Sequence, residues 1–215
     1  TPSDALEAGV AVPSSALVVT NALPQVDSVT LSPSDVYTGS TITASVVATD
    51  ADGDAVSLAY AWSSSDGTDL SAETGSTLDG TGTPGFAKGE VLTVSVTPVE
   101  TNDASAIGTA VTQDITVLNS PPGAPVVSVS PSEPDPDVDD LVCSVNGISV
   151  DIDGDAVTYS FEWYEGGALT SHTTNTVAST DTLPGQAWRV EVSADDGFGS
   201  GPAGTAELTI ANSPP

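Results

Sequence analysis

The stretch DADGDAVSLAYAW at residues 50–62 returns, nearly letter for letter, as DIDGDAVTYSFEW at residues 151–163. Both copies begin with an aspartate-rich segment, continue into alternating apolar residues, and end on a tryptophan, Trp62 or Trp163. Self-similarity at a fixed period is typical of tandem arrays, in which each copy is one structural unit. The sequence therefore predicts two copies of the same small domain.

A second marker gives the limits of these units. The tetrapeptide Asn-Ser-Pro-Pro occurs at residues 119–122 and again at residues 212–215. We therefore divide the chain into repeat 1, residues 21–118, and repeat 2, residues 119–215 with a C-terminal linker. Each copy is then about 95 to 100 residues long, a size typical of a single Ig-like domain.

Residues 1–20 are similar to the end of a full repeat, because the segment 16–21 matches 114–119. We interpret them as the terminal hairpin or strand of a preceding, truncated repeat, in a window of a longer array. The alternative is a true mature end whose unpaired strand completes the sheet of another molecule. The residues of this predicted assembly strand are Ala16, Leu17, Val18 and Val19.

Apolar and polar residues alternate with a period of two in several short segments, a pattern that indicates half-buried β-strands. The clearest apolar faces are Val56, Leu58, Tyr60 and Trp62 in repeat 1, and Val157, Tyr159, Phe161 and Trp163 in repeat 2. Further faces are Ile42, Ala44, Val46 and Ala48, then Leu92, Val94 and Val96, matched by Leu141, Cys143 and Val145, then Trp188, Val190 and Val192. These patterns predict an all-β protein of tandem Ig-like β-sandwiches, seven-stranded with Greek-key connections.

The segment from Asp50 to Gly67 resembles the centre of polycystic-kidney-disease (PKD) type and related cadherin-like repeats of bacterial extracellular surface proteins. There, an aspartate-rich turn leads into a strand with a tyrosine and a tryptophan. The second copy matches through Trp163 and then departs, with Gly166-Gly167 in place of an Asp-Gly turn. The resemblance implies an extracellular or cell-surface protein with a spacer, adhesive or fibre-forming role and no catalysis.

The charge balance limits the partners. The chain has 30 acidic residues and two basic ones, Lys88 and Arg189, for a formal net charge of −28. Such a surface repels nucleic acid and anionic membranes. At 38% hydrophobic residues the chain still has enough apolar material for a core. No segment is predicted to insert into a membrane, so the expected partners are other copies or neighbouring repeats.

Carboxylates gather in loops that the predicted sandwich brings to one end of each repeat. Calcium takes six to eight hard oxygen ligands, which aspartates around a glycine supply. We therefore predict calcium at the domain junctions, an arrangement similar to that of cadherin-like repeats. The predicted ligands are Asn21, Asp50, Asp52, Asp54, Glu100 and Asp103 in repeat 1, and Asn119, Asp151, Asp153, Asp155, Asp195 and Asp196 in repeat 2.

The alternative is that these aspartates only form turns, because Asp and Gly also bond their own backbone in turns. The acidic run at residues 133–140 is expected to be a solvated, proline-stiffened loop, or else a contact with a following repeat. Cys143 is expected to be a buried core residue, with an intermolecular disulfide as the alternative. His172 has no second histidine to share a metal and is expected at the surface.

The sequence shows no nucleophile with a plausible base and no phosphate-binding loop, so we expect no enzymatic activity. The predicted function is a structural or adhesive element of a surface fibre or stalk, probed best by imaging for filaments. The alternative is a carbohydrate-binding accessory region of a secreted enzyme, which would need exposed aromatic residues. Only Tyr37 and Tyr164 lie off the predicted core faces among the tyrosines and tryptophans.

Overall fold

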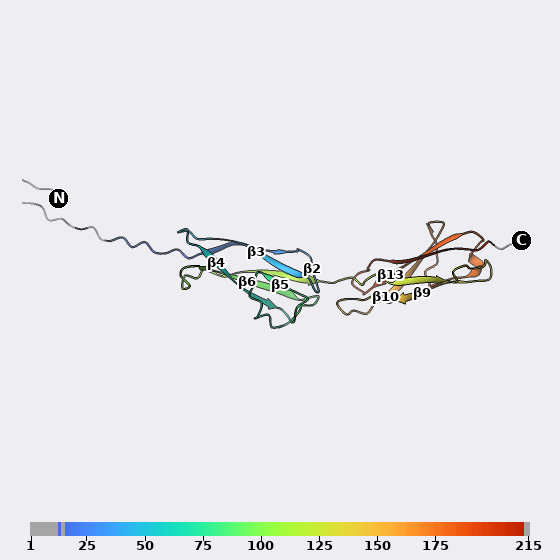
Figure 1. Ribbon diagram of the computed structural model, residues 1–215, viewed down its shortest axis with the longest axis horizontal. Coiled ribbons are helices and arrows are strands. Elements are labelled where there is room, and N and C mark those ends of the chain that lie inside the picture. Colours follow the sequence, from blue (N-terminus) through green and yellow to red (C-terminus); the bar gives the residue numbers. More distant parts are fainter. Residues whose placement is uncertain (1–12, 14–15, 213–215) are drawn as a thin grey trace, which may run out of the picture.

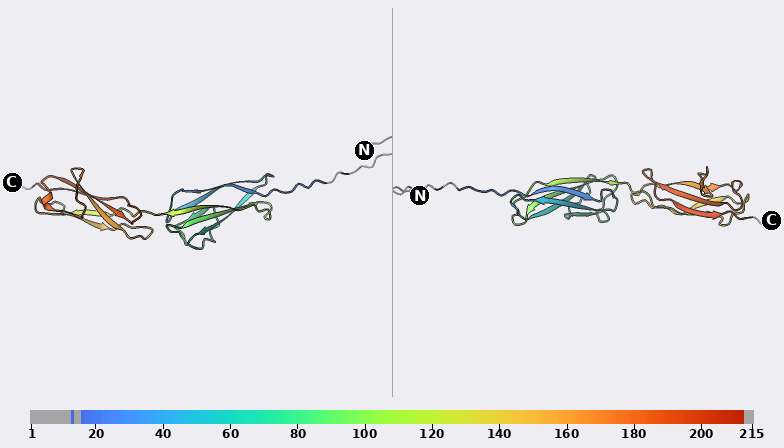
Figure 2. Two further views of the ribbon diagram at one scale, coloured as in Figure 1. Left: turned by 180° about the vertical axis from the view of Figure 1, so that it is seen from behind. Right: turned by 90° about the horizontal axis from the view of Figure 1, so that it is seen from above.

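The computed structural model of the protein describes residue 13 and residues 16–212. Two β-sandwiches lie end to end, and the chain passes from the first to the second through an extended linker (Figure 1). The other two views show the same elongated arrangement (Figure 2). Each sandwich has its own cluster of buried apolar residues, one from Val29 to Val117 and one from Leu141 to Ile210. The alternating segments therefore form two separate cores.

Repeat 1 contains seven strands in two sheets. They are β1 (Gln25–Ser32), β2 (Val36–Tyr37), β3 (Thr41–Thr49), β4 (Val56–Ser64), β5 (Thr77–Asp79), β6 (Val91–Glu100) and β7 (Val111–Leu118). One sheet has the order β1-β3-β5 and the other the order β2-β7-β6-β4. Because β3 and β4 are consecutive but lie in different sheets, the chain crosses between the sheets at the aspartate loop.

Repeat 2 also contains seven strands, again divided into a three-stranded and a four-stranded sheet. They are β8 (Val126–Ser130), β9 (Leu141–Gly147), β10 (Thr158–Glu165), β11 (Ala168–Leu169), β12 (Thr176–Val177), β13 (Ala187–Asp195) and β14 (Gly204–Thr209), with a short 3-10 helix at Ser179–Asp181. The sheet orders are β12-β9-β8 and β11-β10-β13-β14. This strand order confirms the predicted all-β, tandem Ig-like architecture.

The two tryptophans occupy matching core positions, as predicted. Trp62 lies opposite Val94 on β6, and Trp163 lies opposite Val190 on β13. Both are buried, and each indole N–H donates to a backbone carbonyl, of Gly75 at 3.0 Å or of Thr174 at 2.9 Å. A buried indole needs such a partner for its N–H. The alternating faces listed for the other core strands are likewise buried or half-buried.

The seventh strand differs between the repeats, so the expectation of two equivalent seven-stranded sandwiches holds only for six strands. In repeat 1, β2 pairs in parallel with β7, whereas in repeat 2, β11 pairs with β10. Strand β11 follows from the two-residue turn Gly166-Gly167, whose φ angles of 55° and 88° are both positive. Tight hairpins favour such turns, and glycine adopts them without steric cost. The departure from the first copy thus adds an edge strand.

Candidate metal centres and the domain junction

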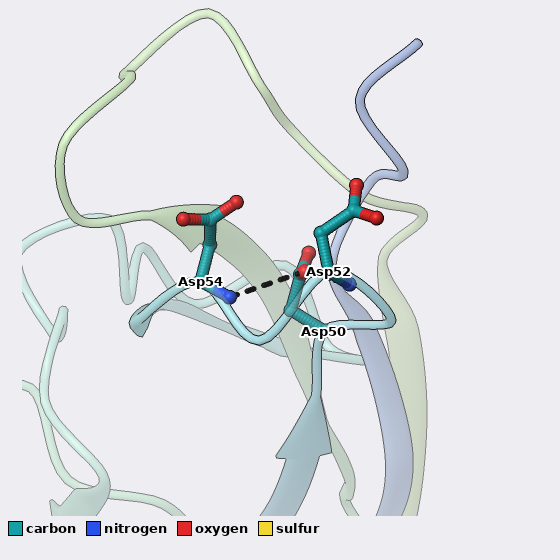
Figure 3. Close-up of side chains that lie close together, drawn as sticks. All are labelled: Asp50, Asp52 and Asp54. Atoms are coloured by element: carbon teal, nitrogen blue, oxygen red, sulfur yellow. Dashed lines mark hydrogen bonds between the residues drawn. The ribbon is translucent and has the colours of Figure 1, made fainter. Parts of the chain in front are cut away.

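The first carboxylate cluster, Asp50, Asp52 and Asp54, lies in the loop between β3 and β4, and its three side chains project from that loop (Figure 3). One carboxylate oxygen of Asp50 accepts the backbone N–H groups of Asp52, at 2.8 Å, and of Asp54, at 3.3 Å. Gly53, with φ of 84°, closes the turn by donating to the Asp50 carbonyl. The residue types thus bend the loop so that the three carboxylates converge.

The chain segment entering repeat 1 is bound to this end of the sandwich twice. The side-chain amide of Asn21 donates to Glu100, at the end of β6, over 2.5 Å. The backbone N–H of Ala22 donates to Asp52 over 2.6 Å. Glu100 is only 6% exposed, so its bond to Asn21 satisfies a carboxylate that is largely removed from water.

Repeat 2 reproduces this arrangement bond for bond. Asp151 accepts the N–H groups of Asp153 at 2.8 Å and Asp155 at 3.3 Å, while Asn119 donates to Asp196 at 2.8 Å. The backbone N–H of Ser120 donates to Asp153 at 2.7 Å, as Ala22 does to Asp52. The linker is therefore clamped to the leading end of each repeat, the end at which the chain enters, by one amide and one backbone N–H.

The hydrogen bond from Asn119 has an electrostatic consequence. It is the main reason that the pKa of Asp196 lies below its ordinary value of 3.8, with further lowering by the N–H groups of Phe198 and Gly199. Donors that bind the charged form of a carboxyl favour its ionisation. Asp196 therefore stays charged although the residue is only 7% exposed.

The second carboxylate cluster is Asp151, Asp155 and Asp196, and it differs in membership from the first. Within the described residues these are the two groups in which three carboxylates each offer an oxygen within 4.8 Å of the others. Oxygens on opposite sides of a Ca²⁺ ion lie about 4.6 to 5.2 Å apart, from ligand distances of about 2.3 to 2.6 Å. Both spacings therefore fit a calcium ion.

One oxygen in each cluster lacks a partner. The Oδ2 atoms of Asp50 and Asp151 are buried and accept no hydrogen bond from the described residues. A buried carboxylate oxygen without a donor carries an uncompensated cost of desolvation. A cation at that point would remove the cost, which makes Asp50 and Asp151 the residues best suited to hold one.

Asp103 and Asp195, two of the predicted ligands, are bound within their own loops. Asp103 accepts the N–H and hydroxyl of Ser105, at 2.9 and 2.6 Å, and these bonds lower its pKa. Asp195 accepts the N–H of Gly197 and the hydroxyl of Ser200. Both carboxylates thus stabilise the turns of their own loops, and neither belongs to a three-carboxylate group.

Sequence reasoning missed Lys88, which extends from the loop between β5 and β6 of repeat 1 to repeat 2. Its ammonium forms an ion pair with Asp155 and donates to the side-chain oxygen of Asn119 at 3.2 Å. It also lies 3.7 Å from the centre of the Phe198 ring. The available signal was that Lys88 is the single lysine of a chain with net charge −28, placed in a trailing-end loop.

A second contact crosses the junction beside Lys88. The hydroxyl of Thr38, in the turn after β2, donates to Asp153. A Cβ atom placed on the neighbouring Gly39 would lie 3.7 Å from the Ile152 side chain, so the two loops are close. Asp153 thereby binds repeat 1 through Thr38 and the linker through Ser120.

The predicted assembly strand forms no strand here. Ala16 to Val19 have no assigned secondary structure, and Leu17 and Val19 are 90% and 83% exposed. The remainder of the segment 1–20, apart from residues 13 and 20, lies outside the described residues. Donation of this strand to another sheet therefore stays a prediction.

Other sequence-based expectations have simpler outcomes. Cys143 is buried in the core of repeat 2, and burial raises the pKa of its thiol. His172 is half-buried, with its ring 5.8 Å from that of Trp188, so the expectation of a surface residue holds only in part. In the acidic run at 133–140, Pro134 and Pro136 are buried while most of the acidic residues are exposed.

Comparison with known proteins gives little beyond the fold. No family model matches the chain, and no curated protein matches its sequence. Similar solved structures include the FN1–FN3 domains of chicken CNTN1, at 13% identity and a TM-score of 0.36 over 91% of this chain and 68% of that one. Three N-terminal domains of the bacteriophage RB49 Highly Immunogenic Outer Capsid protein (Hoc) are 18% identical, with a TM-score of 0.31 over 87% of this chain and 59% of that one. A Dscam structure that describes the basis of isoform specificity is 12% identical, with a TM-score of 0.33 over 90% of this chain and 46% of that one.

These TM-scores and identities are too low for any argument about function, and the strand order alone carries the Ig-like assignment. The chain spans 59% and 46% of the length of the Hoc and Dscam chains. Among the described residues, no helix has the length and hydropathy needed to cross a bilayer.

Proposed function

We propose that this chain is a segment of an extracellular, non-catalytic stalk or fibre, in which Ig-like repeats act as stiff structural or adhesive units. The observation that supports it best is the double clamp on the linker, through Asn119 to Asp196 and through Ser120 to Asp153. A linker bonded at both positions has little freedom to bend. Two sandwiches joined in this way form an extended rod, the arrangement seen in Figures 1 and 2.

The repeat limits proposed for this array are residues 21–118 and 119–215, with residues 1–20 as the end of a preceding repeat. The equivalence of the two clamps supports this division, because Asn21 and Asn119 hold the same place at the start of each unit. The chain would then continue an array of PKD-type or cadherin-like units on a bacterial cell surface.

Calcium is the proposed cofactor, and its best site is the first carboxylate cluster. Asp50 has a buried oxygen without a donor, and the carboxylates of Asp50, Asp52 and Asp54 offer oxygens within 4.8 Å of one another. The two basic residues of the chain pair elsewhere, Lys88 with Asp155 and Arg189 with Glu191. An ion bound there would offset their mutual repulsion and stiffen the chain before repeat 1.

The proposed partners are further repeats or other copies of the chain. The exposed Leu17 and Val19 support this, because an extended apolar segment in water favours pairing with a sheet edge. A heterologous contact of this kind propagates, and so builds a fibre. The carbohydrate-binding alternative gains no support, since Arg189 lies over the ring of Tyr164 at 4.3 Å.

The calcium part of the proposal is tested by thermal stability. Calcium at about 1 to 10 mM should raise the melting temperature of the wild type, because binding to the folded state alone stabilises it by mass action. The Asp50→Ala variant should lose this gain, while Asp114→Ala, on β7 away from the clusters, should keep it. If EDTA and calcium give identical melting curves in the wild type, the clusters are turns only.

The assembly part of the proposal has its own test. Deleting residues 1–20 should leave both sandwiches folded while removing long particles from electron micrographs. Fibres that persist in the deleted form would contradict strand donation. Single particles in both forms would contradict the fibre role.

A further inference from the structure

Lys88 lies in a tight turn that is held by hydrogen bonds within repeat 1. Residues 87–90 form a tight turn in which the N–H of Glu90 donates to the carbonyl of Ala87 at 3.3 Å, and Gly89 at the third position has φ of 84°. A positive φ at that position is the signature of a type II turn. The Glu90 carboxylate, 8% exposed, fixes the turn through the N–H of Ala87 at 2.8 Å and the hydroxyl of Ser64 at 2.6 Å.

The ammonium of Lys88 meets three groups, all in the linker or repeat 2. These are the Asp155 carboxylate, the side-chain oxygen of Asn119 and the face of Phe198. The orientation of Asn119 suits this contact, because its NH₂ group donates to Asp196 and so directs its oxygen away from that acid. Carboxylate, amide oxygen and aromatic face are each attractive to a cation.

We propose that Lys88 is the built-in cation of this junction: it pairs from the preceding domain with Asp155, one carboxylate of the second cluster, and so fixes the angle between the repeats without a metal ion. The side chains of Lys88 and Asp155 are both 23% exposed, so their ion pair is partly removed from water. Partial burial makes such a pair stronger than an open surface pair, and the ring of Phe198, itself 72% exposed, adds a cation–π contact to the ammonium.

Repeat 2 provides an internal comparison for this role. Its residues 183–186 form the same turn, with Gly185 at φ of 78° and the N–H of Gln186 donating to the carbonyl of Leu183 at 3.2 Å. The position of Lys88 is taken by Pro184, which carries no charge. The turn is therefore common to both repeats, whereas the cation belongs only to the junction described here.

The principal test measures domain orientation in EDTA, so that it does not depend on calcium binding at the first cluster. Residual dipolar couplings give one alignment tensor for each repeat. In the wild type the two tensors should coincide, as expected for a rigid pair. In Lys88→Met, which keeps most of the apolar stem, the tensors should diverge. Lys88→Arg, which keeps the charge, should retain most of the common alignment.

The matched control is Arg189→Met, which removes the other basic residue of the chain. Arg189 is paired with Glu191 inside repeat 2, so its loss changes the net charge equally without touching the junction. Its tensors should stay coincident. Coincident tensors in Lys88→Met, or equal divergence in Arg189→Met, would overturn the proposal.

A chemical readout tests the same contact. Because Lys88 is the single lysine, acylation of lysine followed by peptide mass analysis reports on that residue alone. Asp155→Asn and Phe198→Ala should each raise the acylation rate of the folded protein in EDTA, since each frees the ammonium. Asp181→Asn, in repeat 2 away from the junction, should leave the rate unchanged. An unchanged rate in both junction variants would contradict a held lysine.

Discussion

The leading ends of repeats 1 and 2 share the same hydrogen bonds, but within the part of the chain that the structure describes only that of repeat 2 has a basic side chain beside its carboxylates. In both, one aspartate accepts two N–H groups of its loop, an asparagine of the linker donates to a buried acid, and the next residue donates to the middle aspartate. They differ in that Lys88 lies against the second cluster. Among the described residues, no lysine, arginine or histidine pairs with Asp50, Asp52 or Asp54.

This difference teaches that the clamp and the cation are separate parts of the junction. The clamp follows from the loop and linker sequences, which recur in both copies. The cation comes from the preceding domain and depends on one residue of its trailing loop. If the proposals on calcium and on Lys88 hold, an array built on this plan would set the stiffness of each junction separately, with a lysine at one junction and a metal ion at another.

The cores of the repeats offer the largest expected contrast. Trp163→Ala should cost about 3 to 5 kcal/mol of folding free energy, because it empties a large buried volume. Trp62→Ala should cost somewhat less, since Trp163 also packs edge to face on Trp188, with ring centres 6.3 Å apart, where repeat 1 has Leu92. Chemical denaturation followed on amide NMR signals of each repeat measures both, because Trp62→Ala leaves repeat 1 without a tryptophan for fluorescence.

The control for this pair is Leu169→Ala, at an exposed edge position, which should change stability little. Equal losses in the two tryptophan variants would show that the second aromatic ring adds nothing. A loss as large in Leu169→Ala would mean that the assigned core is wrong.

A smaller loss of stability is expected where a backbone carbonyl of the entering segment lies against a glycine of each repeat. A Cβ atom on Gly201 would lie 1.8 Å from the carbonyl oxygen of Pro122, and one on Gly108 would lie 1.8 Å from that of Pro24. Either glycine to alanine change forces the linker away, at a cost of about 1 to 3 kcal/mol. Thermal unfolding should show similar losses for both repeats, because the close approach is the same.

Gly199→Ala is the matched control, since a Cβ there meets nothing within 4 Å. It should be close to neutral. If Gly201→Ala is as well tolerated as Gly199→Ala, the linker is not held against the loop and the clamp is weaker than described.

The smallest expected effect is on the dependence of folding stability on acid pH. The pKa of Asp196 is lowered mainly by its bond from Asn119, so its folded value lies below that of the unfolded chain. Its contribution to stability is present above about pH 4 and is lost as the pH falls through the lowered folded value. Asn119→Ala should raise the pKa of Asp196, as measured by carboxyl NMR titration. It should also reduce the loss of folding stability as the pH falls below about 4. Asn146→Ala, on β9, is the control, and the same shift there would contradict the assignment.

Much of the fold could be predicted from the sequence, because alternation and burial have the same cause. The apolar faces around Trp62 and Trp163 became core because a half-buried strand repeats every two residues. The edge strands could not be predicted, since β2 and β11 are two residues long and depend on local turn geometry.

The site was predictable in its loops and not in its contacts between domains. The turn around Asp50 follows from a local motif, and so does that around Asp151. Lys88 is 67 positions from Asp155, and only the end-to-end arrangement of the sandwiches brings them together. Asp103 and Asp195 have a different reason: Ser105 and Ser200, in their own loops, donate to them, and the sequence motif alone does not show these bonds.

The most direct test of the different cations is a calcium titration followed on two matched amides. Gly53 and Gly154 donate to the carbonyls of Asp50 and Asp151, so each reports on its own cluster. The account predicts that the Gly53 signal shifts at about 0.1 to 1 mM calcium. The Gly154 signal should need about tenfold more, because the charge of Lys88 repels a second cation nearby. A Gly154 shift at the same or lower calcium, or no shift of Gly53 at all, would contradict it.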